Sequence, residues 1–271
     1  MRLYLIVVGT RPEIIKMAPI VWEMQKRKMR HMVFFTQQHF THALGAQFLD
    51  DMGYNVPVVL SQPKTKRTGW NFGESLSFLQ GFLTSSDGEV VMLAEGDTHS
   101  VALAAMLSVI TNQPFVHVEA GLRSYDFSMR EERYRRMADE AAAVMLCPLA
   151  AHQYNLEHCL GRKYVVGNTI ADVVNRYTEK TTKEDVALIT LHRGELLEER
   201  SVLLGVLKSI SAALLKKGMT GVFPLHPHTD LVLRKGKGET FKPDRLKGIK
   251  FTNPLNYKST LQAIAKSKLV I

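Results

Sequence analysis

Three acidic side chains stand where predicted strands give way to turns and helices. Asp97 follows an apolar strand at 89–93, Glu119 ends a second strand at 114–119, and Glu131 opens the next helix. Neighbouring carboxylates raise one another's pKa, so that one group can act as an acid while another acts as a base. Because the carboxyl ends of parallel strands meet at one edge of a sheet, these positions predict a site for proton transfer.

Two of these acidic residues also have a structural explanation. Asp97 stands where a helix begins, and aspartate is a preferred N-cap residue. Glu119 ends an apolar strand, where an unpaired carboxylate is costly, and Arg123 is a candidate ion-pair partner for it. The sequence leaves both alternatives open.

Basic and polar side chains follow the other predicted strands. In the stretch VVGTRPEIIKMAP, residues 7–19, Arg11 and Lys16 lie near the start of a helix, whose positive end attracts anions. A capped helix with two solvated charges explains the same stretch, with Pro12 at its first helical position. The remaining candidates at turns are Gln38, His39, Asn168, His192, Arg193 and His226, of which His192 and Arg193 suit a diphosphate.

Apolar runs rich in Val, Ile and Phe alternate with helical patterns along the chain. Such alternation is typical of βαβ units and parallel sheets. We expect a surface loop at 53–71. We also expect a polar linker at 177–186, after which the alternation restarts, and therefore two Rossmann-like domains, 1–176 and 177–271. Strands are predicted near 3–8, 31–36, 89–93, 114–119, 144–147, 163–166, 186–192, 221–226, 248–252 and 268–271, and helices near 12–28, 73–86, 99–110, 198–217, 229–235 and 257–267.

The composition is that of an ordinary globular protein with excess positive charge. Apolar residues make up 45% and charged residues 23% of the chain, and the formal net charge is +9. A phosphorylated small molecule and general solubility both explain this charge, whereas no aromatic-rich basic module of the nucleic-acid-binding type is seen. No apolar run approaches the roughly 20 residues of a membrane span, and the N-terminal run is too short for a signal peptide, so we expect a cytoplasmic location.

The cysteines and histidines predict neither a disulfide framework nor a metal site. We expect no zinc site at the two thiols, Cys147 and Cys159, because we see no clustered histidines to accompany them. A proline separates His226 from His228, so these two histidines are weak evidence for a metal site. We therefore expect no bound metal.

A series of specific motifs occurs along the chain in a characteristic order. They are GTRPEIIKMAP, QQH, EGDT, HVEAGLRS, REE followed by Arg135, VGNTIADVV, TLHR, LHP and PLNY. This order resembles the UDP-N-acetylglucosamine 2-epimerase family, non-hydrolysing type. The resemblance runs from residue 3 to the last residue, and GTRPEIIKMAP and HVEAGLR are its long and specific motifs.

The resemblance implies an α/β, GT-B-like fold in which the parallel sheets of two Rossmann-like domains face a central cleft. It implies reversible inversion at C2 of UDP-N-acetylglucosamine (UDP-GlcNAc), which gives UDP-N-acetylmannosamine (UDP-ManNAc). UDP is eliminated and then adds back to a 2-acetamidoglucal intermediate. Carboxyl groups would move the C2 proton, and cationic groups would stabilise the leaving diphosphate. The resemblance implies no cofactor, and suggests a homodimer that serves cell-surface polysaccharide biosynthesis.

Residue roles carry over by position. Asp97 and Glu131 match the acid/base pair, and Glu119 would position the sugar or share the proton transfer. His192 matches a catalytic histidine on the diphosphate side. The substrate-binding positions implied by the resemblance are Arg11, Lys16, Gln38, His39, Arg123, Arg135, Asn168, Arg193 and His226.

Some positions depart from the family's pattern. Tyr134 stands where the usual residue is Asn, and Arg130 replaces a proline that usually starts the helix. The chain ends at KLVI, where the family continues into a T-D-S-G-G turn, so we expect the second domain to be incomplete. A hydrolysing epimerase that releases N-acetylmannosamine (ManNAc) and UDP stays open as an alternative. So does a truncated, non-catalytic module that binds nucleotide sugars.

Overall fold

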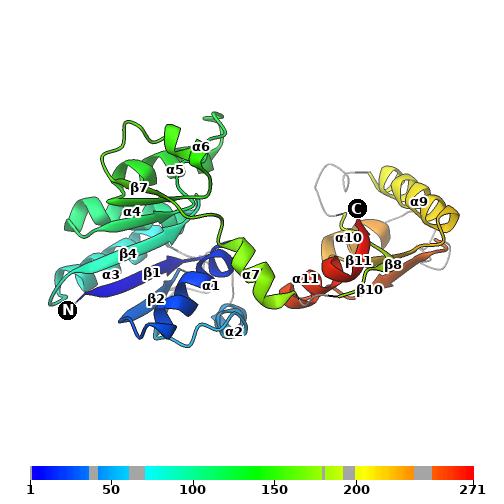
Figure 1. The fold of residues 1–271 in the computed structure, drawn as a ribbon, viewed down its shortest axis with the longest axis horizontal. Coiled ribbons are helices and arrows are strands. Elements are labelled where there is room, and N and C mark those ends of the chain that lie inside the picture. Colours follow the sequence, from blue (N-terminus) through cyan, green and yellow to red (C-terminus); the bar gives the residue numbers. More distant parts are fainter. Residues whose placement is uncertain (1, 37–41, 61–70, 179–180, 192–198, 235–245) are drawn as a thin grey trace. The chain divides into compact units, whose positions relative to one another are not determined.

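The predicted alternation of strands and helices is present in the computed structural model (Figure 1), which describes residues 2–36, 42–60, 71–178, 181–191, 199–234 and 246–271. The chain divides into two compact units, Met1–Val173 and Val174–Ile271. Figure 1 draws the first unit from blue to green and the second from green to red. Among the described residues, no helix is both long and apolar enough to cross a membrane.

The first unit is built on a seven-stranded sheet in which every described strand pair is parallel. The strand order is β3-β2-β1-β4-β5-β6-β7, so the chain adds strands first on one side of β1 and then on the other. The central strand β4 is a continuous apolar run ending in Glu95, and all of its residues are buried, as expected for a sheet covered on both faces. The strands are β1 (Leu3–Val8), β2 (His31–Phe35), β3 (Val58–Leu60), β4 (Val90–Glu95), β5 (Phe115–Val118), β6 (Val144–Cys147) and β7 (Arg162–Val165).

Local signals start several of the connecting helices. Thr10 is the N-cap residue of α1, and Pro12 stands in the first helical turn. The side chains of Asn71 and Thr98 cap α3 and α4 by accepting hydrogen bonds from backbone N–H groups of the first turn. The helices are α1 (Arg11–Lys26), α2 (His42–Asp51), α3 (Phe72–Thr84), α4 (His99–Thr111), α5 (Arg130–Ala141), α6 (Ala150–Tyr154) and α7 (Ile170–Tyr177), which continues into the second unit.

The second unit contains a four-stranded parallel sheet of order β10-β9-β8-β11. Its core is formed by the buried face of α9 and by the strands, with Leu203, Leu207 and Leu214 in one cluster with Phe223. The strands are β8 (Glu184–Leu188), β9 (Thr220–Pro224), β10 (Ile249–Thr252) and β11 (Ser267–Val270), and the helices are α9 (Arg200–Lys216), α10 (Pro227–Arg234) and α11 (Tyr257–Lys266).

Two expectations about irregular segments were wrong. The stretch 177–186 is not a linker throughout, because β8 begins at Glu184 and pairs with β9 and β11 on its two sides. The stretch 53–71 contains β3, which is parallel to β2. In both cases the segment lacks a long apolar run, and backbone pairing with a neighbouring strand compensates for the weak local pattern.

Candidate functional site

The turns after β1, β4 and β5 lie at one edge of the first sheet. These three strands are neighbours and parallel, so their carboxyl ends point the same way. The chain adds β2 and β3 on one side of β1 and then β4 to β7 on the other, and in open α/β sheets ligands bind beyond the carboxyl ends at such a switch of direction. The fold therefore brings the residues that follow these strands to the edge where a ligand site is expected.

Lys16, Glu95 and Glu119 form a charged cluster at this edge. The Nζ atom of Lys16 lies 2.8 Å from Oε1 of Glu95 and 2.6 Å from Oε2 of Glu119. The side chains of Glu95 and Glu119 are only 2% and 14% exposed. The Glu119 carboxylate is thus paired with Lys16, and the alternative that Arg123 pairs with it is wrong.

The buried position of this cluster changes the pKa values of two members. Burial raises the pKa of Glu95 well above its ordinary value; Lys16 opposes this shift and Glu119 adds to it. Burial by itself would lower the pKa of Lys16, but the charges of Glu95 and Glu119 outweigh burial and raise the pKa. The ammonium ion is therefore held firmly in its charged form between the two carboxyl groups.

Glu119 has a backbone conformation that is unusual for its residue type. Its φ angle is +64°, in the left-handed region that favours glycine. A side chain in this region costs on the order of 1–3 kcal/mol, and such strain concentrates at functional sites. The carboxylate of this strained residue is the one that contacts Lys16.

Glu13 connects the turn after β1 with the turn after β4. Its buried carboxylate accepts hydrogen bonds from the backbone N–H groups of Gly9 and Thr10 at 2.9 and 2.7 Å. The hydroxyl of Thr98 donates to the other carboxylate oxygen at 2.5 Å. This arrangement fixes the positive end of α1 against the start of α4.

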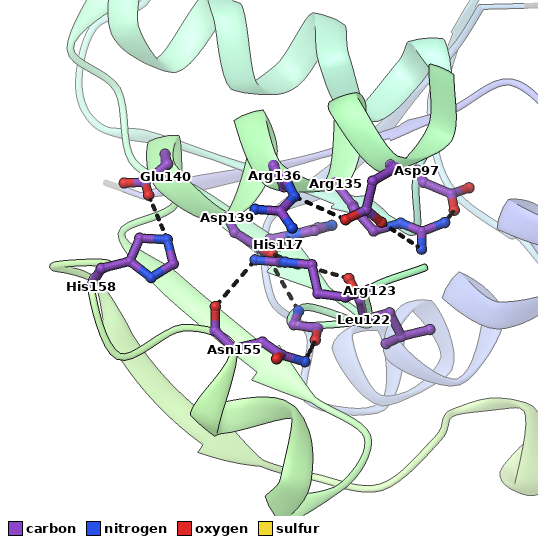
Figure 2. A network of polar contacts seen from close by, with 12 residues as sticks. Asp97, His117, Leu122, Arg123, Arg135, Arg136, Asp139, Glu140, Asn155 and His158 are labelled. Carbon is purple, nitrogen blue, oxygen red and sulfur yellow. Dashed lines mark hydrogen bonds and ion pairs between the residues drawn. The ribbon is translucent and has the colours of Figure 1, made fainter. Parts of the chain in front are cut away.

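Asp97 is held by an arginine of α5. Its Oδ2 atom accepts a hydrogen bond from Nη2 of Arg135 (Figure 2). The Nη1 atom of the same guanidinium lies 3.3 Å from Oε2 of Glu132. The Asp97 side chain remains 35% exposed. Because Thr98 is the N-cap residue of α4, the capping explanation for Asp97 is wrong.

The adjacent residues Glu131 and Glu132 have opposite environments. Glu131 is exposed in the first turn of α5, whereas Glu132 is fully buried. The Glu132 carboxylate accepts hydrogen bonds from the Ser124 backbone N–H at 2.8 Å and from Nε of Arg136 at 2.9 Å. Burial alone would raise the pKa of Glu132, but these donors outweigh it and lower the pKa. Glu132 is thus a structural carboxylate, and Glu131 is available to a ligand.

A buried network beneath this edge contains two residues that the sequence did not single out, His117 and Asp139 (Figure 2). The carboxylate of Asp139 lies 2.7 Å from Nδ1 of His117 and 2.6 Å from Nη1 of Arg123. The other ring nitrogen of His117 lies 2.8 Å from the carbonyl oxygen of Gly96, next to Asp97. The network joins α5 to the turn after β4, and its one signal in the sequence is a histidine inside an apolar strand.

The other predicted binding residues are distributed over both units. The guanidinium of Arg11 lies over the ring of Phe48, with Cζ 5.7 Å from the ring centroid. The Asn168 side chain accepts a hydrogen bond from the Ile170 N–H after β7, and His226 is exposed after β9. Gln38, His39, His192 and Arg193 lie outside the described residues.

One group of side chains in the described part of the chain could hold a metal ion, although we expected none. The ligand atoms of Glu140, His158 and Cys159 lie within 4.8 Å of one another. Two of these side chains already form an ion pair, with Nε2 of His158 2.9 Å from Oε1 of Glu140. Burial raises the pKa of the Cys159 thiol to about 11, which keeps it in its neutral form. In Figure 2 the pair of Glu140 and His158 lies apart from Asp97.

Comparison with known proteins gives one family. The family model for UDP-N-acetylglucosamine 2-epimerase matches residues 23–271. The UDP-N-acetylglucosamine 2-epimerase of Methanococcus maripaludis is 29% identical over 98% of this chain and 76% of its own length. The structure of the UDP-GlcNAc 2-epimerase of Methanocaldococcus jannaschii matches with a TM-score of 0.77 and 25% identity, over 100% of this chain and 78% of that chain. A structure of the same enzyme in complex with UDP-GlcNAc and UDP matches over the same shares of the two chains, with a TM-score of 0.70 and 27% identity.

The two parallel sheets agree with these similarities. The expected GT-B-like fold, with two Rossmann-like units, is confirmed. Three of the motifs that suggested the family, GTRPEIIKMAP, EGDT and HVEAGLRS, lie at the carboxyl ends of β1, β4 and β5. The chain belongs to the UDP-N-acetylglucosamine 2-epimerase family.

Proposed function

We propose that this protein interconverts UDP-GlcNAc and UDP-ManNAc by inversion at C2. The observation that carries the proposal is the placement of Asp97 and Glu119 after the adjacent strands β4 and β5, in a chain of this family. In the proposed reaction a carboxylate takes the C2 proton while the bond from C1 to the diphosphate breaks, which gives 2-acetamidoglucal and UDP. A carboxylic acid then returns a proton to the other face of C2, and UDP adds back at C1.

We assign the proton transfers to Asp97 and Glu131. Asp97 is partly exposed and Glu131 is exposed, so both carboxyl groups are accessible to a sugar. Arg135 donates to Asp97 and fixes its orientation, which general acid–base catalysis requires. Glu119 is mostly buried and paired with Lys16, which suits a role in positioning the sugar.

We assign the diphosphate to the positive end of α1 and to basic residues near it. Arg11 is exposed in the first turn of this helix, where its guanidinium and the positive helix end favour an anion. Lys16 is engaged with two carboxylates and is assigned to Glu119 instead. We assign His192 and Arg193 to the diphosphate as well, on the basis of the family motif TLHR.

The test is incubation with UDP-GlcNAc in heavy water, followed by mass spectrometry and NMR of the sugars. We expect deuterium at C2 of both UDP-GlcNAc and UDP-ManNAc, with no free ManNAc. Release of free ManNAc in step with UDP would instead establish the hydrolysing reaction. Binding of UDP-GlcNAc without any deuterium at C2 would contradict catalysis and favour a non-catalytic binding module.

We also propose that the protein works as a homodimer in the cytoplasm. The observation that favours association is an apolar surface on α4 and α5, in which Met106, Val109, Ile110 and Met137 are 36–74% exposed. These side chains line a shallow apolar hollow together with Ala105, Glu140 and Ala141. Exposed apolar surface of this kind is typical of protein interfaces.

A further inference from the structure

We propose that Glu95 is a positioning residue, which keeps a proton at neutral pH and thereby leaves the Lys16 ammonium to hold Glu119. The inference rests on the proposed function for its catalytic consequence. Its structural basis is the bridging position of Lys16, whose ammonium contacts both carboxyl groups. Glu95 is a buried, ionisable side chain at the end of an otherwise apolar strand, where such residues are rare unless they are paired.

The charges of the cluster do not balance if every group is ionised. One ammonium ion faces two carboxylates, and Glu95 is almost completely buried. An excess negative charge in such a place is costly, and a carboxyl group avoids it by keeping its proton. Of the two, Glu95 is the more buried, and burial together with Glu119 raises its pKa far more than Lys16 lowers it.

The other titratable groups near Glu95 do not supply the missing positive charge. Tyr54, from the segment after α2, has a pKa that burial and the charges of Glu13 and Glu95 raise well above its ordinary value. Its hydroxyl donates to the carbonyl oxygen of Ile14 at 2.7 Å. The carboxylate of Glu13 is occupied by Gly9, Thr10 and Thr98. The Tyr54 hydroxyl and the Glu13 carboxyl group are neutral or negative, so they favour the protonated form of Glu95.

The protonation of Glu95 has a direct consequence for Glu119. With Glu95 neutral, Lys16 and Glu119 form a balanced pair that holds the strained left-handed backbone at Glu119. When Glu95 ionises at higher pH, it competes for the ammonium ion and places a negative charge beside Glu119. We therefore expect epimerisation to fall as the pH rises through the pKa of Glu95.

The variant Glu95→Gln tests this inference, because glutamine keeps the shape but cannot ionise. The matched control is Glu89→Gln, which precedes the same strand and pairs with Arg2 at the surface. The rate of deuterium exchange at C2 is measured against pH for the wild type and both variants. One pH unit above the alkaline midpoint, the wild type and Glu89→Gln should retain about one tenth of their maximal rate, and Glu95→Gln more than half.

A second measurement reads the proton itself without relying on catalysis. In infrared spectra at neutral pH, the C=O stretch of a protonated carboxyl should be present in the wild type and in Glu89→Gln and be lost in Glu95→Gln. No loss of this band, or an alkaline limb identical in Glu95→Gln and wild type, would overturn the role of Glu95. If the wild type shows no exchange but the band is lost in Glu95→Gln, the proposed function fails while the proton on Glu95 is established.

Discussion

Lys16 on α1 and Glu119 after β5 form an ion pair, in which Nζ of Lys16 lies 2.6 Å from Oε2 of Glu119. The same ammonium ion also contacts Glu95, the last residue of β4. The pair links residues that are 103 positions apart in the sequence. It ties helix α1 to the end of strand β5. A single lysine thus connects the proposed anion side of the site to its proposed acidic side.

Removal of this lysine should lower both activity and stability. Lys16→Met leaves two buried carboxyl groups without a cation, and loss of one partner of a buried pair costs about 3 kcal/mol. The folded-state pKa of Lys16 is raised, so its stabilising contribution is fully present below the pKa of the unfolded chain and is lost as the pH rises through the folded pKa. Urea unfolding of the wild type and Lys16→Met at pH 7 measures the loss.

The matched control is Lys26→Met on the exposed end of the same helix, which should change the free energy of unfolding by less than about 0.5 kcal/mol. Equal stability of wild type and Lys16→Met would show that the contacts of Lys16 contribute nothing to folding.

Replacement of Asp97 should separate catalysis from stability. Asp97→Asn keeps the size of the side chain but cannot exchange a proton, so deuterium incorporation at C2 should fall by about 10²–10⁴-fold. The side chain is 35% exposed and Arg135 keeps its contact with Glu132, so the free energy of unfolding should change by less than about 1 kcal/mol. Exchange kinetics and urea unfolding of the same preparation check both statements, with exposed Asp87→Asn as control. Undiminished exchange in Asp97→Asn would remove it from the acid/base pair.

The neighbours Glu131 and Glu132 should give opposite results. Glu131→Gln should abolish C2 exchange and leave the melting temperature unchanged, because this side chain is exposed. Glu132→Gln should cost roughly 1–3 kcal/mol of stability, because its carboxylate accepts from Ser124 and Arg136 in a buried place. Thermal unfolding and exchange rates of the two variants decide the assignment, and swapped phenotypes would contradict it.

Glu132 should also make the stability of the protein depend on pH. Because the pKa of Glu132 is lowered in the folded state, its contribution is present above the unfolded pKa and is lost as the pH falls through the folded pKa. The gap in stability between wild type and Glu132→Gln should therefore shrink on acidification. Urea unfolding at pH 7 and at pH 4 measures this gap.

The buried network below the site should be essential for folding. Asp139→Asn leaves His117 and Arg123 buried without their shared carboxylate, which should cost about 3–5 kcal/mol. The neighbouring change Glu140→Gln removes an exposed ion pair with His158 and should cost less than about 1 kcal/mol. Urea unfolding measures the free energy of unfolding of both variants. Similar losses of stability in the two variants would show that the buried network does not stabilise the protein more than the exposed ion pair does.

The apolar surface on α4 and α5 should control association. Val109→Asp, at a side chain that is 74% exposed, should convert a dimer into a monomer without changing the melting temperature of the dilute protein by more than a few degrees. Light scattering coupled to size-exclusion chromatography measures the mass, with Phe78→Asp as a control at an exposed apolar residue on α3. A wild-type protein that is monomeric at all concentrations would contradict the dimer.

The class of fold and the positions at which polar residues follow the strands can be read from the sequence alone. Alternating apolar and amphipathic segments require parallel sheets, and local cap residues such as Thr10, Asn71 and Thr98 fix where helices begin. Asp97, Glu119 and Arg11 could be found in this way, because the end of an apolar run can be read directly. The short strand β3 could not, and β8 was predicted at 186–192 but begins earlier, at Glu184, because pairing with neighbouring strands decides these positions more than their own residues do.

The pairing of the charged groups depends on how distant segments pack together. Lys16, and not the nearer Arg123, meets Glu119, because the strand order places α1 beside the ends of β4 and β5. Glu131 and Glu132 face solvent and core because successive helix positions differ by about 100°. His117 and Asp139 meet because β5 and α5 pack together in the core. These pairings depend on distances between segments far apart in the chain, and no local pattern of residues encodes them.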